Sequence, residues 1–429
     1  MRIGANGLGN VLNFSGVITR PGTAAGGTLL LQSGTALINV DQPIDNNGGN
    51  LEATSGAGGA VVLKATPNNI GDTMSDWGGY LRLAISDALV TNRNLTIGQA
   101  TGSTSTDVNG SGGAFDLNGC NQTIRALIGS PANSGTHSTK RKITNTSTVA
   151  STLTLGNGNV SGIFNGVIEV GAGTVALVKV GTASQTLTGN GTNTFSGDTT
   201  LYSGTLVVSN VLALQKSTLN VSGGALTFAG GLTDFTLGGL SGAQNLGLTN
   251  ALNAPVALSV GNNNSDTIFS GALSGSGSLK KIGSGKLTLA GVNTYTGATT
   301  VEAGTLALGC DGALSTGTQI TLNGGTLSAG SFANGLSALS VGASNGTIDV
   351  ADGSGALAFA GSSGQTWAGT LNITFTGEWN PYALRFGTSP AGLSAAQLSS
   401  LRVNGQKTWL MLDAQGYLVR LTGTLIRLM

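Results

Sequence analysis

A fourteen-residue stretch of this chain returns about a hundred residues later, and this repetition constrains the fold more than any other feature. Residues 193–206 read NTFSGDTTLYSGTL and residues 293–306 read NTYTGATTVEAGTL. Each runs on into a stretch ending in Ala-Leu, at 213–214 and 313–314, and a more diverged copy ends the same way at 88–89. Internal repetition is typical of stacked repeat architectures. Because the copies lie about a hundred residues apart, one repeat unit must span several coils.

Short alternating runs inside the repeats predict half-buried strands. Examples are 286–289, 305–308 and 318–322, each bounded by Gly or Asn-Gly. Alternation of period two places Leu, Ile and Val on one face and Thr, Ser or Lys on the other. Outward threonines suit stacked coils, because like residues align in ladders. The sequence therefore predicts an all-β fold, a long parallel β-helix or β-solenoid.

Asn-Gly pairs mark the expected corners, because they supply the positive φ that sharp turns need. They occur at 47–48, 118–119, 165–166, 323–324 and 345–346. Such pairs also form two-residue hairpins, so an antiparallel sandwich is the alternative fold. A sandwich needs paired long strands and large core residues, whereas aromatic residues make up only 5% of this chain. The solenoid is favoured.

Charge excludes nucleic acid as an expected partner. The 429 residues include 19 basic and 18 acidic side chains, a net charge of +1, so no long-range field would concentrate polyanions. The basic run Lys140, Arg141 and Lys142, close to His137, is interpreted as a solvated loop.

Cysteine and histidine usage predicts neither a disulfide framework nor a metal site. Cys120 and Cys310 have no CxxC spacing and no nearby histidine. With about 20 residues per coil and strands about 4.8 Å apart, they would lie far beyond disulfide reach. Any bridge would join different molecules, and no cofactor is expected.

The run 279–306 resembles the autotransporter-associated β-strand repeat of bacteria. Gly-x-Gly, Leu-x-Leu-x-Gly, Asn-Thr-Tyr-x-Gly and Ala-Gly-Thr-Leu all occur in it in order. Residues 177–206 resemble the repeat less closely, because Ala183-Ser184-Gln185 replaces the Gly-x-Gly segment. The resemblance implies a right-handed β-helical passenger or stalk at the cell surface or outside the cell.

Membrane insertion is not expected. Autotransporters end in a membrane barrel of a few hundred residues, and nothing of that size follows these repeats. The first residues lack the apolar region of a signal peptide, and no stretch approaches the roughly 20 apolar residues of a membrane helix. We expect an extracellular mature protein or fragment.

Composition changes near Gly364, since three of the four tryptophans, Trp367, Trp379 and Trp409, follow it. We expect a solenoid over 1–365 and a β-rich cap or assembly domain over 366–429. In the cap, Ser394 to Gln397 reads as a capping box that opens a short helix to about Leu401. The solenoid is expected to consist of three modules, about 1–150, 151–265 and 266–365. The expected strands of the cap are 371–375, 408–412 and 417–421, with a turn at 413–416.

The two ends of the chain are the expected assembly surface. No helix or charged segment shields the strand edges of the first coil, and the last twelve residues are an apolar, strand-prone tail. Addition of this tail to another copy would join molecules head to tail into a filament. The candidate interface residues are Ile3, Val11, Leu12, Phe14, Leu418, Val419, Leu421, Leu425, Ile426 and Leu428.

No catalytic residue is nominated. Parallel β-helices host polysaccharide-degrading enzymes that use grouped carboxylates. Here Asp72, Asp76, Glu302 and Glu378 form no such set in the sequence, and no Ser-His-Asp set can be built around His137. Three functions stay open: a stalk or filament subunit, an adhesin that binds glycans or other cells, and, least favoured, an enzyme.

Overall fold

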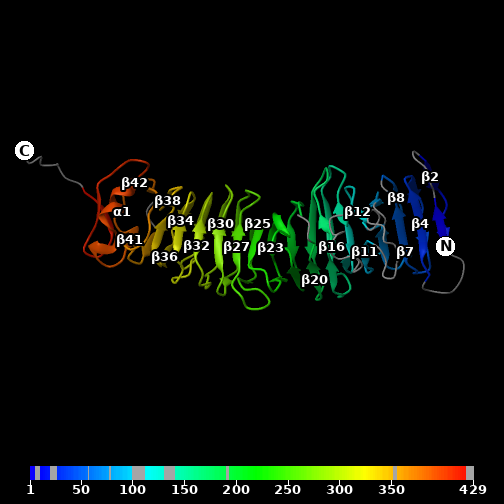
Figure 1. Ribbon diagram of the computed structural model, residues 1–429, viewed down its shortest axis with the longest axis horizontal. Helices are drawn as coiled ribbons and strands as arrows, with labels where there is room; N and C mark the ends of the chain where they lie inside the picture. Colours follow the sequence, from blue (N-terminus) through cyan, green and yellow to red (C-terminus); the bar gives the residue numbers. More distant parts are fainter. Residues whose placement is uncertain are drawn as a thin grey trace, which may run out of the picture. The chain divides into compact units, whose positions relative to one another are not determined.

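The computed structural model describes residues 1–4, 10–19, 27–56, 58–76, 79–98, 112–129, 141–189, 193–350 and 355–421. They belong to two compact units, Met1–Leu232 and Thr233–Met429. In each unit the strands of successive coils stack in parallel, so neighbouring strands have neighbouring colours (Figure 1). The predicted parallel β-solenoid is confirmed.

The first part of the N-terminal unit carries two long parallel ladders. Their strands pair in register from coil to coil, as Leu51 does with Thr73 and Leu37 with Ala60. One ladder is β1 (Arg2–Gly4), β4 (Leu29–Gly34), β7 (Leu51–Ser55), β9 (Thr73–Asp76), β11 (Leu95–Ile97) and β14 (Leu127–Gly129). The other is β2 (Val11–Phe14), β5 (Leu37–Val40), β8 (Ala60–Leu63), β10 (Tyr80–Leu83), β12 (Ala114–Asp116), β15 (Lys142–Thr144) and β18 (Val167–Ile168), and β3 (Ile18–Thr19) pairs with β6 (Ile44–Asp45).

The rest of the N-terminal unit contains the first copy of the sequence repeat. Its strands again form two ladders, paired as Leu177 is with Thr199 and Ser184 with Thr205. The first is β13 (Gln122–Ile124), β16 (Ser151–Leu155), β19 (Val175–Lys179), β21 (Thr199–Leu201) and β23 (Leu214–Val221). The second is β17 (Gly162–Phe164), β20 (Ser184–Leu187), β22 (Thr205–Val208) and β24 (Ala225–Phe228).

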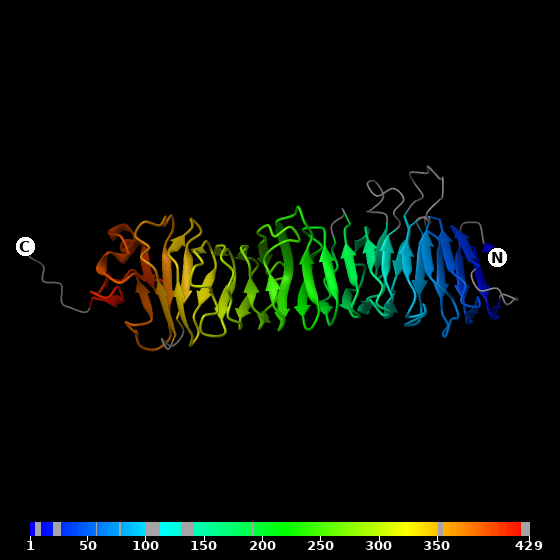
Figure 2. The same cartoon turned by 90° about the horizontal axis from the view of Figure 1, so that it is seen from below.

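The C-terminal unit repeats this arrangement around the second copy, and Figure 2 shows its strands stacked in the same order from a second side. The first ladder is β25 (Asp234–Gly242), β27 (Ala257–Val260), β30 (Ser278–Lys281), β32 (Thr299–Val301), β34 (Ile320–Leu322) and β37 (Leu339–Val341). The second is β28 (Thr267–Phe269), β31 (Lys286–Leu289), β33 (Thr305–Leu308), β35 (Thr326–Ser328), β38 (Gly346–Asp349), β40 (Leu371–Thr374) and β42 (Leu401–Val403). Shorter sets are β36 (Ala333–Leu336), β39 (Ala356–Phe359) and β41 (Leu384–Phe386), and β26 (Leu246–Gly247) with β29 (Leu273–Ser274).

Strand burial alternates with the predicted period of two. In β19 every second residue is buried, and β32, β33 and β34 follow the same pattern. The inward residues are mainly Leu, Ile and Val, with buried phenylalanines such as Phe164 and Phe269 as the last residues of their strands. On the outer face Thr300, Thr321 and Ser340 align from coil to coil. Aliphatic stacking inside and hydroxyl ladders outside explain the Leu- and Thr-rich composition.

The Asn-Gly corners are confirmed in part. Asn47, Asn118 and Asn345 have positive φ, and at the fourth pair Gly324 has a φ of 116°. Neither Asn165 nor Gly166 is left-handed, so that prediction is wrong. There glycine is needed for space, because a Cβ on Gly166 would come within 2.4 Å of the Arg141 carbonyl oxygen.

The C-terminal segment contains the predicted short helix, α1 (Ala395–Ser400), preceded by the 3-10 turn η2 (Pro390–Gly392). Ser394 and Gln397 form both hydrogen bonds of the capping box. The strands β43 (Leu410–Leu412) and β44 (Leu418–Arg420) pair antiparallel around the expected turn. The parallel ladder itself continues through β40 and β42. The three modules and the boundary at 365 stay predictions.

An amide side chain ties three successive coils together at one corner of each repeat. Asn293 accepts a hydrogen bond from the Leu273 amide, 20 residues earlier, and donates to the carbonyl of Ala313. Asn193 does the same between Ile168 and Ala213, and Asn68 between Ile44 and Ala88. We call these three residues the asparagine staples. Their carbonyl acceptors are the alanines of the repeated Ala-Leu pairs.

Replacing Asn293 by Ala is expected to lower the free energy of unfolding of the C-terminal unit by about 1–3 kcal/mol. The substitution leaves the buried Leu273 amide and Ala313 carbonyl without their partner, and an unmade buried hydrogen bond costs about this much. Urea denaturation followed by circular dichroism measures the change.

The control is Thr294→Ala, because Thr294 is the exposed neighbour of the staple. Its effect should stay within about 0.5 kcal/mol. Equal losses for the two variants would contradict the role assigned to the amide.

Candidate functional site

The predicted interface residues at the start of the chain lie on the first strands of the N-terminal unit. Ile3 is half-buried in β1, and on β2 Leu12 and Phe14 are half-buried whereas Val11 is 56% exposed. Among the described residues, β1 pairs only with β4, and β2 only with β5. Each therefore has one edge that pairs with no other described strand.

The predicted interface residues at the other end are divided between the interior and the surface. Leu418 is fully buried, Val419 is half-buried and Leu421 is 57% exposed. The Leu418 side chain therefore supports its own unit. Leu425, Ile426 and Leu428 lie outside the described residues.

The β43–β44 hairpin presents an apolar outer face that the sequence prediction missed. Met411 pairs with Val419, and the Leu421 amide donates to the Trp409 carbonyl at 3.1 Å. Trp409 is 70% and Met411 42% exposed, whereas the alternate residue Leu412 is buried. The sequence signal that could have identified this face is the period-two alternation of residues in the two strands on either side of the 413–416 turn.

The basic run near residue 141 is not the solvated loop that was predicted. Arg141 is fully buried and donates to the Asn165 side-chain oxygen at 2.9 Å. Lys142 begins β15 and forms an ion pair with Glu169 at 3.2 Å. The prediction failed because charged residues were assumed to face water. His137 and Lys140 lie outside the described residues.

Two of the carboxylates considered for catalysis are paired with cations. Asp72 contacts Arg125 at 3.2 Å and Glu302 contacts Lys280 at 3.1 Å, while Glu378 is exposed. Asp76 ends strand β9. Within the described ranges no three His, Cys, Asp or Glu residues form a group that could hold a metal ion.

Cys120 and Cys310 are free, and burial together with a neighbouring carboxylate raises the pKa of each thiol. No helix in the described part of the chain is long and apolar enough to cross a membrane.

A buried lysine occupies the same place in both copies of the repeat. Lys281 is 1% exposed, and its Nζ donates to the carbonyls of Ile282 at 2.7 Å, Gly283 at 2.9 Å and Ala303 at 3.2 Å. Lys179 is 2% exposed and contacts Val180, Gly181 and Ser203 in the same way.

These carbonyls lie in turns, outside the strand ladders. Each ammonium therefore ties the turn of its own coil to the turn of the next coil. We call this arrangement the lysine clamp.

Burial lowers the pKa of both clamp lysines. The pKa of Lys281 falls from an ordinary 10.5 to about 8, although the negative charge of Asp266 opposes the shift. The pKa of Lys179 is lowered by burial alone. Desolvation penalises the ammonium in both copies, and the three carbonyl oxygens offset part of that cost.

The fold and the clamp define a class of protein: a parallel β-solenoid that carries passenger-type repeats. Residues 177–208 and 279–308, which contain both clamps and most of both repeats, match the model of the passenger-associated-transport-repeat family. This match confirms the resemblance predicted for these segments.

The chain is also similar to the Adhesin BmaC autotransporter of Brucella suis biovar 1 (strain 1330). The two are 30% identical over a 318-residue alignment, and the match covers 70% of this chain. The chain spans only 8% of the length of that relative. No solved structure matches the chain.

The clamp predicts a specific dependence of stability on pH. Between pH 8 and 10.5 the unfolded chain still holds the Lys281 proton that the folded chain has lost, so stability from this group rises with pH. Wild type should therefore gain up to about 3 kcal/mol relative to Lys281→Met across this window. Urea denaturation at pH 7 to 10.5 measures the difference.

Lys280→Met is the matched control, because Lys280 is the exposed neighbour on the opposite face and has an ordinary surface ion pair. Wild type is expected to gain no comparable stability relative to Lys280→Met between pH 8 and 10.5. If the two methionine variants show the same pH profile, Lys281 does not titrate as assigned.

Proposed function

We propose that this chain is a surface-exposed or secreted passenger solenoid of the adhesin type, whose coils present binding surfaces outside the cell. One observation carries the proposal: both copies of the passenger repeat build the same lysine clamp, in the segments that match the family model. The similarity to a relative named as an adhesin supports the same role.

A structural or binding role is favoured over an enzymatic one. The relative is named for adhesion, and the repeat family is named for passenger transport. The asparagine and lysine that the two repeat copies share point inward, where the staples and clamps connect coils. They serve the scaffold, and ligand contacts are left to the outer faces and terminal segments.

Purified chain carrying a fluorescent label should bind cultured mammalian cells saturably, and unlabelled chain should compete. The monomer is expected to suffice, because the proposed surfaces belong to single chains. Flow cytometry over a concentration series measures the binding.

The matched control is the same labelled chain after irreversible unfolding. Binding that stays linear with concentration, or that the unfolded chain reproduces, would count against adhesion.

A second candidate function is head-to-tail self-association into stalks or filaments. Two features favour it: the edges of β1 and β2 that pair with no other described strand, and the apolar face around Leu421. Exposed strand edges recruit further strands, and a contact between two different surfaces of one molecule does not close on itself. Growth would then continue in one direction.

Val11→Lys and Leu421→Lys are each expected to weaken self-association at least tenfold, since each places a charge on an exposed apolar position at one end. Sedimentation velocity and negative-stain electron microscopy measure assembly.

Val292→Lys provides the control, because Val292 is 60% exposed and lies between β31 and β32, which are not terminal strands. Wild type that stays monomeric at every concentration would eliminate self-association.

A further inference from the structure

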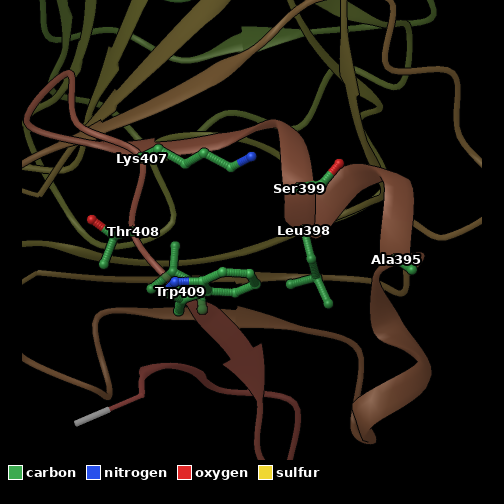
Figure 3. Close-up of a pocket in the computed structure, with 7 residues that line it drawn as sticks. Ala395, Leu398, Ser399, Lys407, Thr408 and Trp409 are labelled. Carbon is green, nitrogen blue, oxygen red and sulfur yellow. The ribbon is translucent and has the colours of Figure 1, made fainter. Parts of the chain in front are cut away.

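A cleft at the C-terminal end of the chain combines an exposed aromatic ring with a positive charge. It has a volume of about 350 Å³ and lies between α1 and the segment that leads into β43. Ala395, Leu398 and Ser399 line it from the helix, and Lys407, Thr408 and Trp409 from the opposite side. Figure 3 shows the Lys407 side chain and the Trp409 ring on either side of the opening, with Leu398 facing them from the helix.

Trp409 differs from the other described tryptophans of this unit. Trp367 donates its Nε1 hydrogen to the Leu339 carbonyl at 2.9 Å, and the Trp379 ring packs edge-on against Phe375 at 5.4 Å. Trp409 instead leaves 70% of its surface exposed. An exposed indole offers a flat apolar face with a polar edge, which suits the C–H face of a pyranose ring.

The charge around the cleft is positive. Among the described residues that line it, Lys407 alone is charged. Arg402 does not line the cleft, and its guanidinium donates to the carbonyls of Ser399 at 3.2 Å and Leu401 at 2.7 Å, at the C-terminal end of α1. A lining ammonium with no acidic residue among the described lining residues favours a ligand that carries a carboxylate.

The hydroxyls of the cleft leave acceptors for a ligand. Ser399 donates its hydroxyl hydrogen to the Ala396 carbonyl, and Thr408 donates to the Gln406 carbonyl. A hydroxyl that donates internally still has lone pairs that accept from sugar hydroxyls. The cleft therefore offers a stacking face, a cation and hydrogen-bond acceptors together.

We propose that this cleft binds an acidic carbohydrate, with a sugar ring stacked on Trp409 and its carboxylate near Lys407. The assignment rests on the adhesin role proposed above and specifies one ligand class for it. An apolar peptide segment fits less well, because it would cover the Lys407 ammonium without supplying a counter-charge. The chain's own residues 422–429 contain Arg427 and no acidic side chain, so none of their side chains supplies a counter-charge for Lys407.

The test is isothermal titration calorimetry of the full chain with trigalacturonic acid and with sialyllactose. At least one of the two should bind saturably. Because salt screens an ionic contact, the affinity should fall roughly severalfold between about 0.05 and 0.5 M NaCl. For trigalacturonic acid, the fully methyl-esterified trisaccharide is the matched probe, and it should bind at least tenfold more weakly.

Trp409→Ala should lose at least tenfold in affinity, whereas Trp409→Phe should stay within about threefold because it keeps an aromatic face. Lys407→Met should remove most of the preference for the charged probe. Tyr202→Ala is the control variant, because Tyr202 is a comparably exposed aromatic residue, 59%, in the other unit.

Three results would overturn the proposal: no saturable binding of either probe, unchanged affinity in Trp409→Ala, or binding that appears only after truncation beyond Leu421. Concentration-dependent dimers that Trp409→Ala abolishes would also overturn it, because the cleft would then contact a second copy. If labelled Trp409→Ala still binds cells like wild type, the adhesin role stands and this cleft is not its site.

Discussion

Each coil of this protein depends on its neighbours for the pairing of its backbone. In a parallel solenoid a strand pairs with the coils before and after it, at a spacing of about 4.8 Å, and it has no hairpin partner of its own. The turns fall outside these ladders, so their polar groups need other partners. The lysine clamps supply partners for turn carbonyls, and each asparagine staple joins a strand amide, such as that of Leu273, to an alanine carbonyl of a following coil.

Two kinds of residue therefore carry the repeat. Leu and Val on the inner face supply burial, and their identity varies between copies, as at Leu201 and Val301. Asn293 and Lys281 supply directed hydrogen bonds to backbone atoms, and both types recur unchanged at Asn193 and Lys179. One apolar side chain can replace another of similar volume in the interior, whereas a turn carbonyl needs a hydrogen-bond donor at one fixed position.

Much of the fold could be predicted because strand alternation and repetition are local signals. The helix at Ala395–Ser400 was predictable for the same reason, since its capping box lies within four residues. Lys281 was missed because a charged residue was assigned to water, although its parity with Leu279 places it inside. The place of Trp409 in a surface cleft was not predicted from the sequence. The cleft is lined jointly by Trp409 and Leu398, and these residues come together only when the chain folds. Cleft geometry of this kind has no local sequence signal.

The staples also bear on how such a chain can change in length. Asn293 connects a donor 20 residues before it with an acceptor 20 residues after it, so every tie has the reach of one coil. After insertion or loss of a whole coil, each remaining staple still faces an equivalent backbone partner. A change of half a coil would instead turn inward residues outward and separate the staples from their carbonyl acceptors. Gene duplication can thus lengthen or shorten the solenoid in steps of one coil without redesign of its interior.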